Sequence, residues 1–364
     1  MKHYRSTLIT GGAGFIGSKL GAALVPFTDH VTVFDNLLPQ VHGSDAVAPA
    51  NRPGYDFELG DIRDRQAIAG CVSRCEPDLI VHLAADTGTG QSFDEVGRYC
   101  AVNVQGTAYL VEALRNRATD QPYRVILASS RAIYGEGAYL DGEGSIFVPP
   151  PRNAEDMRNG VFTLNDAAGR TATPVATAED IALNPASIYA STKLMQEYIL
   201  AQSLTGTAAE LVILRLQNVY GPGQSLRNPY TGVLSIFSQQ ILDGKLPLNI
   251  YEDGDIVRDF IFIDDVVRAF VAAATVDRPP AQPANIGSAE GVTILEAAQT
   301  LLEYFGRDPE AVRISGQFRT GDIRHARADI ERARTLLGWS PQIDIREGLA
   351  RLVRSIAQAH EPSR

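Results

Sequence analysis

Apolar residues follow two different patterns along the first 217 residues. Short apolar runs predict strands, and segments with apolar residues every three or four positions predict helices. The expected strands lie at 6–9, 31–34, 56–59, 79–83, 124–128 and 209–214; the expected helices span 65–75, 94–116 and 188–205, with a further one ending near 25. Strands that alternate with helices form a parallel sheet covered on both faces. The pattern therefore predicts an α/β fold with a doubly wound parallel sheet.

The rhythm breaks between Gly135 and Ser187, where Pro, Gly and polar residues dominate. A structureless loop of this length inside a compact domain is uncommon, so the segment is either functional or a small ordered insertion. After residue 217 the patterns mix, and strands are expected at 249–251 and 259–263. The remainder is therefore expected to form a smaller lobe of mixed structure.

A glycine-rich turn follows the first expected strand. Residues 10–17 read Thr-Gly-Gly-Ala-Gly-Phe-Ile-Gly, with Gly11, Gly14 and Gly17 regularly spaced. Such a turn tolerates positive φ and lets a diphosphate approach the backbone, and the helix that it opens supplies free N–H groups for the phosphates. Asp35 ends the second strand, where a carboxylate accepts hydrogen bonds from the ribose hydroxyls of a dinucleotide. Because Asp35 would repel a 2′-phosphate, the motif predicts a Rossmann-type domain that binds NAD rather than NADP.

A Tyr–Lys pair provides candidate acid–base chemistry. Tyr189 and Lys193 are spaced i, i+4, which places both side chains on one face of an expected helix. A phenol has a pKa of about 10, and a neighbouring ammonium together with a bound cationic nicotinamide lowers that pKa. Tyr189 can then take a proton from a substrate hydroxyl while hydride leaves the same carbon. Ser129 and Ser130 follow the fifth expected strand, at the edge where ligands bind to open parallel sheets.

The composition narrows the kinds of partner that the protein is expected to bind and the compartment in which it is expected to act. Lys+Arg 33 against Asp+Glu 43 gives a net charge of −10, which disfavours binding to nucleic acid or to anionic membranes. The three cysteines provide no disulfide framework and have no nearby His for a zinc site, so no metal is expected. The chain has no run of 18 apolar residues, and its start leads directly into a strand rather than reading as a signal peptide. We therefore expect a cytoplasmic protein that acts on a small molecule.

The motifs follow one another in the order of a known family. They are TGGAGFIG (10–17), FDN (34–36), GDIRD (60–64), HLAA (82–85), NVQGT (103–107), SSRAIYG (129–135), YASTK (189–193), LRLQNVYGPG (214–223) and RDFIFIDDV (258–266). In this order they are highly specific and cover nearly the whole chain. The sequence resembles the extended short-chain dehydrogenases/reductases, in the NAD-dependent nucleotide-sugar epimerase/dehydratase family.

The resemblance implies a division of the chain into two parts. Residues 1–217 would form the NAD-binding Rossmann domain, with an insertion at about 136–186. Residues 218–364 would form the smaller nucleotide-sugar-binding lobe. Segments of that lobe at about 259–290 would return to the Rossmann domain.

The resemblance also implies which residues bind the cofactor. Asp61 and Ile62 would contact the adenine, and Asn103 would support the cleft from a helix. The full set is Gly11, Gly14, Phe15, Ile16, Gly17, Asp35, Asn36, Asp61, Ile62, Leu83, Ala84, Ala85, Thr87, Asn103, Tyr189 and Lys193.

The implied catalytic residues are Ser130, Tyr189 and Lys193, since the catalytic Ser/Thr of the family lies four residues before the Tyr of SSRAIYG. Asn218 would bind the substrate near its diphosphate. Arg258 and an arginine of the stretch FRTGDIRH would neutralise that diphosphate, because guanidinium groups bind phosphates in a bidentate manner. Within the stretch we favour Arg324 over Arg319. Tyr189 and Ser130 would also touch the sugar, and Gly88, Gln91 and Arg131 are further candidates for shaping its pocket.

Two positions after Ser130 separate the reaction types of the family. The 4,6-dehydratases carry Asp-Glu there, whereas this chain has Arg131 and Ala132. The Glu of sugar-nucleotide decarboxylases is also absent. The remaining groups suffice for C4 epimerisation, in which a 4-keto sugar forms, turns over in the site and is reduced on its other face.

Three further segments resemble a branch of the family that epimerises dTDP-L-rhamnose to dTDP-6-deoxy-L-talose. They are DNLLPQVHG (35–43), TGTGQS (87–92) and SSRAIYGEG (129–137), and the long stretch from Ser130 to Tyr189 is typical of that branch. Three alternatives stay open. They are a UDP-hexose 4-epimerase, a nucleotide-sugar 4-ketoreductase or dehydrogenase that releases its cofactor, and an NAD(H)-binding sensor. The family resemblance also implies a homodimer formed through the helices around 94–116 and 188–205.

Overall fold

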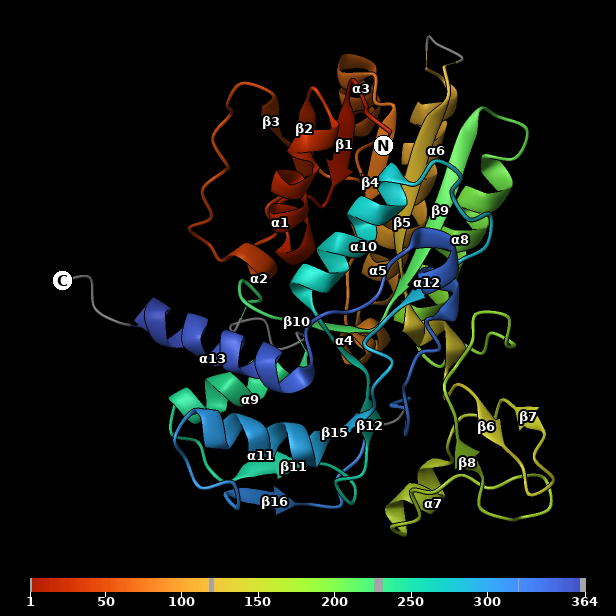
Figure 1. Cartoon of the computed structure of the whole chain (residues 1–364), viewed down its shortest axis with the longest axis vertical. Coiled ribbons are helices and arrows are strands. Elements are labelled where there is room, and N and C mark those ends of the chain that lie inside the picture. Colours follow the sequence, from red (N-terminus) through yellow and green to blue (C-terminus); the bar gives the residue numbers. More distant parts are fainter. Residues whose placement is uncertain (1, 118–120, 226–231, 320, 361–364) are drawn as a thin grey trace.

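A seven-stranded parallel sheet forms the centre of the structure (Figure 1). The computed structural model describes residues 2–117, 121–225, 232–319 and 321–360. The strand order is β14-β9-β5-β4-β1-β2-β3, and every neighbouring pair is parallel. The strands are β1 (Thr7–Thr10), β2 (Val31–Asp35), β3 (Tyr55–Leu59), β4 (Leu79–His82), β5 (Tyr123–Ser130), β9 (Ala209–Leu216) and β14 (Ala284–Ile286). The doubly wound α/β fold predicted from the sequence is confirmed.

Helices cover both faces of the sheet and form two hydrophobic cores. On one face lie α3 (Arg65–Cys75), α6 (Gly106–Arg115) and α8 (Ile188–Ser203); on the other lie α1 (Phe15–Leu24) and α10 (Ile263–Thr275). Adjacent strand residues point to opposite cores, as Leu8 and Ile9 do. Because both faces are buried, the strands read as continuous apolar runs rather than as alternating ones.

The helix expected over 94–116 is present from Val96 to Arg115, with a π-helical stretch inside it. It consists of α5 (Val96–Tyr99), the π-helical stretch (Cys100–Gln105) and α6, and a short helix α4 (Thr89–Asp94) precedes it. The break between α4 and α5 falls at Glu95, whose φ of −116° and ψ of 42° are not helical. Helical periodicity does not reveal such a break, because the apolar spacing continues across it. The π-helical stretch carries Asn103, and such stretches occur frequently at functional sites.

The segment between Ser130 and Tyr189 is an ordered insertion with a sheet of its own. It contains β6 (Tyr139–Leu140), β7 (Ile146–Phe147), β8 (Thr173–Pro174) and α7 (Ala154–Arg158), after a 3-10 turn at Arg131–Tyr134. The three strands pair antiparallel in the order β7-β6-β8. Figure 1 shows this unit projecting beyond the carboxyl ends of the main strands.

A second lobe, also on that side of the sheet, comes from the C-terminal part of the chain (Figure 1). Its strands form two-stranded pairs, parallel β10–β13 and β11–β16 and antiparallel β12–β15. Their bounds are β10 (Asn218–Tyr220), β11 (Leu248–Ile250), β12 (Val257–Arg258), β13 (Phe260–Phe262), β15 (Val292–Thr293) and β16 (Val312–Ile314). The remaining helices are α2 (Pro39–His42), near the cofactor end, and α9 (Val233–Leu242), α11 (Ile294–Tyr304), α12 (Glu331–Leu337) and α13 (Ile345–His360), with a 3-10 turn at Val25–Phe27.

The topology fixes where a ligand can bind. The chain runs outward from β1 to β2 and β3, then returns to place β4 on the other side of β1. Loops leaving β1 and β4 therefore separate and open a crevice at the carboxyl edge, which is the binding position in open α/β sheets.

Candidate active site

A cavity of about 1260 Å³ extends along this carboxyl edge and between the sheet and the second lobe. All the site residues predicted from the sequence line it, except Gln91, Asn103 and Arg324. The cavity thus joins the glycine-rich turn, the Tyr–Lys pair and the second lobe in one continuous space.

The glycine-rich turn has the geometry that a diphosphate requires. Gly11 has φ +68°, and a Cβ at this position would lie 2.6 Å from the backbone nitrogen of Ala84. A Cβ on Gly17 would lie 2.5 Å from the Cα of Gly12, so the first turn of α1 packs directly on the loop. Any side chain would fill this cradle, and α1 begins at Phe15 with its N-terminal N–H groups facing the cavity end of the loop. These residues fit the pyrophosphate of a dinucleotide.

Acidic and polar groups line the neighbouring part of the cavity. Asp35 accepts hydrogen bonds from the backbone nitrogens of Ala13 (3.0 Å) and Leu37 (2.8 Å), which orient its carboxylate at the cavity wall. Hydrogen bonds from Arg63 lower the pKa of Asp61 to about 2, and Asn36 donates to the same carboxylate. This carboxylate-rich end suits ribose hydroxyls and an adenine amino group, and it repels an additional phosphate.

Ser130, Tyr189 and Lys193 meet at the other end of the crevice. Ser130 ends β5, and the Ser187 side chain caps α8 by accepting the Ala190 N–H at 3.1 Å. This cap sets the start of the helix, so that Tyr189 and Lys193 face the cavity one turn apart. The three predicted catalytic side chains therefore lie in one place.

The protonation of this group depends on burial and on local charge. Burial raises the pKa of Tyr189, while a hydrogen bond with Ser130 and the positive charge of Arg131 lower it. Burial lowers the pKa of Lys193 to about 7, against the opposing effect of the Glu197 carboxylate. At neutral pH Lys193 is therefore poised between its two protonation states, and Tyr189 needs further positive charge to act as a base.

The two serines at the end of β5 have different environments. Ser129 donates a short hydrogen bond to Glu197, which also forms two hydrogen bonds with Arg215. Ser130 accepts the N–H of Ala132 and lies against Tyr189. Ser129 thus belongs to a buried ion-pair network, and Ser130 is the serine whose hydroxyl meets Tyr189.

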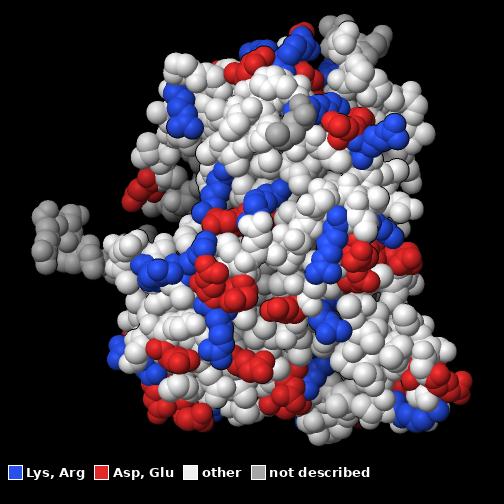
Figure 2. Space-filling view, viewed as in Figure 1, with Lys and Arg blue, Asp and Glu red and all other residues white. Residues whose placement is uncertain are grey.

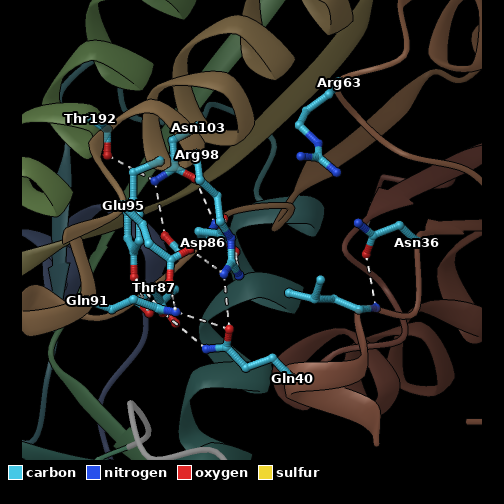
Figure 3. A network of polar contacts seen from close by, with 12 residues as sticks. Asn36, Gln40, Arg63, Asp86, Thr87, Gln91, Glu95, Arg98, Asn103 and Thr192 are labelled. Atoms are coloured by element: carbon cyan, nitrogen blue, oxygen red, sulfur yellow. Dashed lines mark hydrogen bonds and ion pairs between the residues drawn. The ribbon is translucent and has the colours of Figure 1, made fainter. Parts of the chain in front are cut away.

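A network of polar contacts holds the loop after β4 (Figure 3). Arg98 donates to both oxygens of Asp86, at 2.7 and 3.0 Å, and Asn103 bonds the N–H and the carbonyl of Asp86 at 2.8 and 3.0 Å. Arg98 also donates to Gln40 of α2 at 3.1 Å. The network fixes residues 86–90, which line the cavity and include Gly88 with φ +127°.

Asn103 supports the cleft from a helix, as expected, whereas Gln91 lies away from its predicted position. Asn103 is fully buried, with its amide also bonded to Thr192, and it supports the cavity without reaching it. Gln91 was a candidate for the sugar pocket, but it is buried against Gln40 and Glu95 and does not line the cavity. Both act through the loop after β4, because their side chains lie behind it.

One of the two arginines expected at the diphosphate, Arg324, does not line the cavity, and this prediction was wrong. Arg324 is bound to Glu252 (3.0 Å) and Asp253 (2.5 Å) and does not line the cavity. Arg319, which we ranked second, lines the cavity with its guanidinium over the ring of Tyr251. Sequence spacing cannot distinguish the two, because the acidic partners of Arg324 lie about 70 residues away in the chain.

Three arginines and one carboxylate face the substrate end of the cavity. Arg131, Arg258 and Arg319 line it, together with Asn218, as the sequence predicted for all but Arg319. Asp322 pairs with Arg258 at 2.6 Å and lines the same wall. The net positive charge suits an anionic ligand such as a diphosphate.

Several cavity residues escaped the sequence reasoning. They are Asp86, Arg98, Gln217, Gln224, Asn249, Tyr251 and Asp322. Asp322 lies in the stretch FRTGDIRH, between Arg319 and Arg324, and its position there could have indicated it from the sequence. Gln217 lies in the motif LRLQNVYGPG, and the remaining residues belong to no quoted motif, since folding alone brings them to the cavity.

Neither a cluster of metal-binding side chains nor a membrane-spanning helix is found in the described ranges. Within them, no cluster of three or more His, Cys, Asp and Glu could hold a metal ion. No described helix is long and apolar enough to cross a membrane. On the face shown in Figure 2, basic and acidic side chains are interspersed rather than gathered in a basic patch.

Comparisons with known proteins agree with this site. Residues 8–141 match the family model described as GDP-mannose 4,6 dehydratase, and residues 165–287 match the NAD dependent epimerase/dehydratase family. The dTDP-L-rhamnose 4-epimerase of Burkholderia thailandensis is 38% identical over 97% of this chain and 95% of its own.

Solved structures give the same result. UDP-glucose 4-epimerase from Thermotoga maritima, solved with UDP-glucose, superposes with a TM-score of 0.78 at 29% identity and covers 98% of this chain and 100% of its own. UDP-glucuronic acid 4-epimerase from Bacillus cereus, solved with UDP-glucuronic acid and NAD, has a TM-score of 0.76 at 26% identity, with coverages of 98% and 100%. The chain therefore belongs to the NAD-dependent epimerase/dehydratase family and is an enzyme whose cofactor is NAD.

Proposed function

We propose that the protein is a nucleotide-sugar 4-epimerase that acts on a dTDP-6-deoxysugar, interconverting dTDP-L-rhamnose and dTDP-6-deoxy-L-talose. The observation that carries the reaction type is the composition of the catalytic end. Ser130, Tyr189 and Lys193 lie together, and the next two residues are Arg131 and Ala132 rather than a pair of acids. The site has one acid–base residue at the reacting oxygen, and epimerisation at C4 needs no second one.

The residues of the chain act on the C4 hydroxyl and on the charge around it. Tyr189 takes the hydroxyl proton and later returns it, while Ser130 holds the same oxygen by a hydrogen bond. The Ser130 hydrogen bond and the charge of Arg131 oppose the effect of burial on the pKa of Tyr189. The Lys193 ammonium, one helical turn away, would favour the phenolate form further. NAD, held by the glycine cradle and by Asp35, supplies the hydride acceptor and donor when bound.

The substrate end supports a diphosphate-linked sugar. Arg258, Arg319 and Asn218 line this end of the cavity, and we assign the two guanidinium groups to the diphosphate. A sugar that turns over between the two hydride transfers must be held by its diphosphate rather than by its ring. The positive charge of the arginines at this end of the cavity suits that role. The choice of dTDP-L-rhamnose rests on the relative from Burkholderia thailandensis and on the shared sequence segments.

Proton NMR on the purified protein with dTDP-L-rhamnose and no added cofactor tests this proposal. We expect the resonances of a C4-epimerised sugar, since the cofactor ends each cycle unchanged and stays bound. Turnover of UDP-hexoses alone would favour the UDP-hexose 4-epimerase alternative. Turnover that requires added NAD(P)H would replace the epimerase by a reductase, and NAD binding without any turnover would favour the sensor.

We also propose that the protein is a homodimer joined through α4, α5 and α8. These helices contact one another and expose Phe93, Val96, Met195 and Tyr198, each more than 40% accessible. Sedimentation is expected to give twice the chain mass for the native protein and the single chain mass for Met195→Glu. A native monomer would contradict the proposal.

A further inference from the structure

A chain of buried polar side chains lies behind Lys193, on the side away from the cavity. The Lys193 ammonium donates to the Oε1 atom of Gln196 at 2.5 Å, and the Gln196 Nε2 atom donates to the Thr107 hydroxyl at 2.8 Å. The Thr107 hydroxyl lies 2.9 Å from His82 Nε2, and His82 Nδ1 lies 2.7 Å from the Thr10 hydroxyl. None of these side chains is more than 4% exposed.

The chemistry of the groups sets the direction of each hydrogen bond. An ammonium has only donors, so the carbonyl oxygen of Gln196 must face Lys193 and its NH₂ must face Thr107. The Thr107 hydroxyl donates to the Asn103 carbonyl at 2.6 Å, and it therefore accepts from both Gln196 and His82. The Gln196 amide is thus held at both ends.

The histidine completes the chain as a neutral group. Because the Thr107 hydroxyl donates to the Asn103 carbonyl, we assign the ring proton to Nε2, which donates to Thr107, while Nδ1 accepts from the hydroxyl of Thr10. The Gln196 Nε2 atom also lies 3.2 Å from His82 Nε2. Burial, with the nearby charge of Lys193, lowers the pKa of His82 to about 3, so the ring stays neutral. Thr10 ends β1 and precedes the glycine cradle, so the chain connects the cradle to the catalytic helix.

We propose that Gln196 is a positioning residue for Lys193, which it holds from behind by a carbonyl oxygen anchored through Thr107 and His82. The inference rests on the proposed catalytic role of Lys193. Without this acceptor the ammonium would have no fixed partner on its buried side, and its charged form would be less stable. A neutral amide favours the ammonium without taking its charge away from Tyr189, which a carboxylate at the same position would do.

The other charged groups near Lys193 are accounted for by partners of their own. Glu197, one helical position beyond Gln196, is paired with Arg215. Arg131, from the turn after β5, faces Tyr189. Of the acids and bases on α4, α5 and the loop after β4, Asp86 and Glu95 are both paired with Arg98.

The lysine content of the chain allows a direct test. Only four lysines are present, Lys2, Lys19, Lys193 and Lys245, so ¹³Cε-lysine labelling gives a simple NMR spectrum in which Lys193→Arg identifies the Lys193 resonance. With saturating NAD, we expect Lys193 to titrate below the other three. In Gln196→Met its pKa should fall by about one to two units, and in Gln196→Glu it should rise by at least about one unit.

Two features make the variants informative. In Gln196→Met the Thr107–His82 and Thr107–Asn103 hydrogen bonds remain, while Lys193 loses its acceptor and Thr107 loses one of its two donors. In Gln196→Glu the second carboxylate oxygen can still accept the His82 N–H, so this variant retains the anchor if the methionine variant does not fold. Gln202→Met, at an exposed position of the same helix, is the matched control and should leave the Lys193 pKa unchanged.

The pH profile of turnover provides a second readout. Since activity requires the Lys193 ammonium, its alkaline limb should move down in pH in Gln196→Met and up in Gln196→Glu. A purely structural role would lower stability or kcat without moving the limb in opposite directions. Unchanged Lys193 titration in both folded variants would overturn the proposal. The titration needs no substrate. It therefore tests the role of Gln196 even if the proposed epimerase activity proves wrong.

Discussion

Replacing Tyr189 by Phe is expected to lower kcat by a factor of about 10²–10⁴, the usual contribution of a general acid–base group. The variant removes only the hydroxyl that exchanges a proton with the substrate. The ring remains, with its edge-on contact to Tyr99 at 6.4 Å between centroids, so α8 should keep its place. Turnover of dTDP-L-rhamnose measured by NMR, or of whichever nucleotide sugar proves active, gives kcat.

NAD content and a matched tyrosine variant control this experiment. Tyr189→Phe should retain bound NAD, because the cradle and Asp35 are unaffected. Tyr109→Phe, on α6 with its hydroxyl bonded to Gln105 and outside the cavity, should keep native kcat. Near-native turnover in Tyr189→Phe would remove Tyr189 from the catalytic role.

Replacing Glu197 by Leu is expected to lower the free energy of unfolding by about 3–5 kcal/mol, the cost of breaking a buried ion pair by removing one partner. Glu197 and Arg215 each have side chains 5% exposed and share two hydrogen bonds at 3.0 and 2.8 Å. Without Glu197, the guanidinium keeps only the Tyr134 hydroxyl and the Glu179 carbonyl as partners. Chemical denaturation measures the loss.

An exposed ion pair provides the comparison. Glu112 pairs with Arg65 at 2.9 Å, and both side chains are about half exposed or more, so Glu112→Leu should cost less than about 1 kcal/mol. Adding Arg215→Met to Glu197→Leu should recover part of the stability, because no unpaired charge then stays buried. Equal losses for Glu197→Leu and Glu112→Leu would show that burial does not determine the cost.

Local signals in the sequence were sufficient for the framework of the fold. Apolar runs located the main strands of the first domain, because a sheet buried on both faces needs continuous apolar residues. The helix at 65–75 was bounded correctly, since Asp64 caps it by accepting the N–H groups of Gln66 and Ala67. The helix expected over 94–116 is present from Val96 to Arg115, but the apolar spacing revealed neither the break at Glu95 before it nor the π-helical stretch within it.

The sequence by itself determined the groups that depend on short spacings. The glycine turn, Asp35 at a strand end, and the Tyr189–Lys193 pair are each set by a few consecutive residues, whose geometry follows from a turn or a helix. Only the tertiary structure decided which arginine faces the ligand. Arg319 stacks on Tyr251 at the cavity, whereas Arg324 is neutralised by Glu252, and the Gln196 amide that holds Lys193 is itself fixed by Thr107, 89 positions away in the chain. Such pairings join residues distant in the chain, and a charge finds its partner only when the chain has folded.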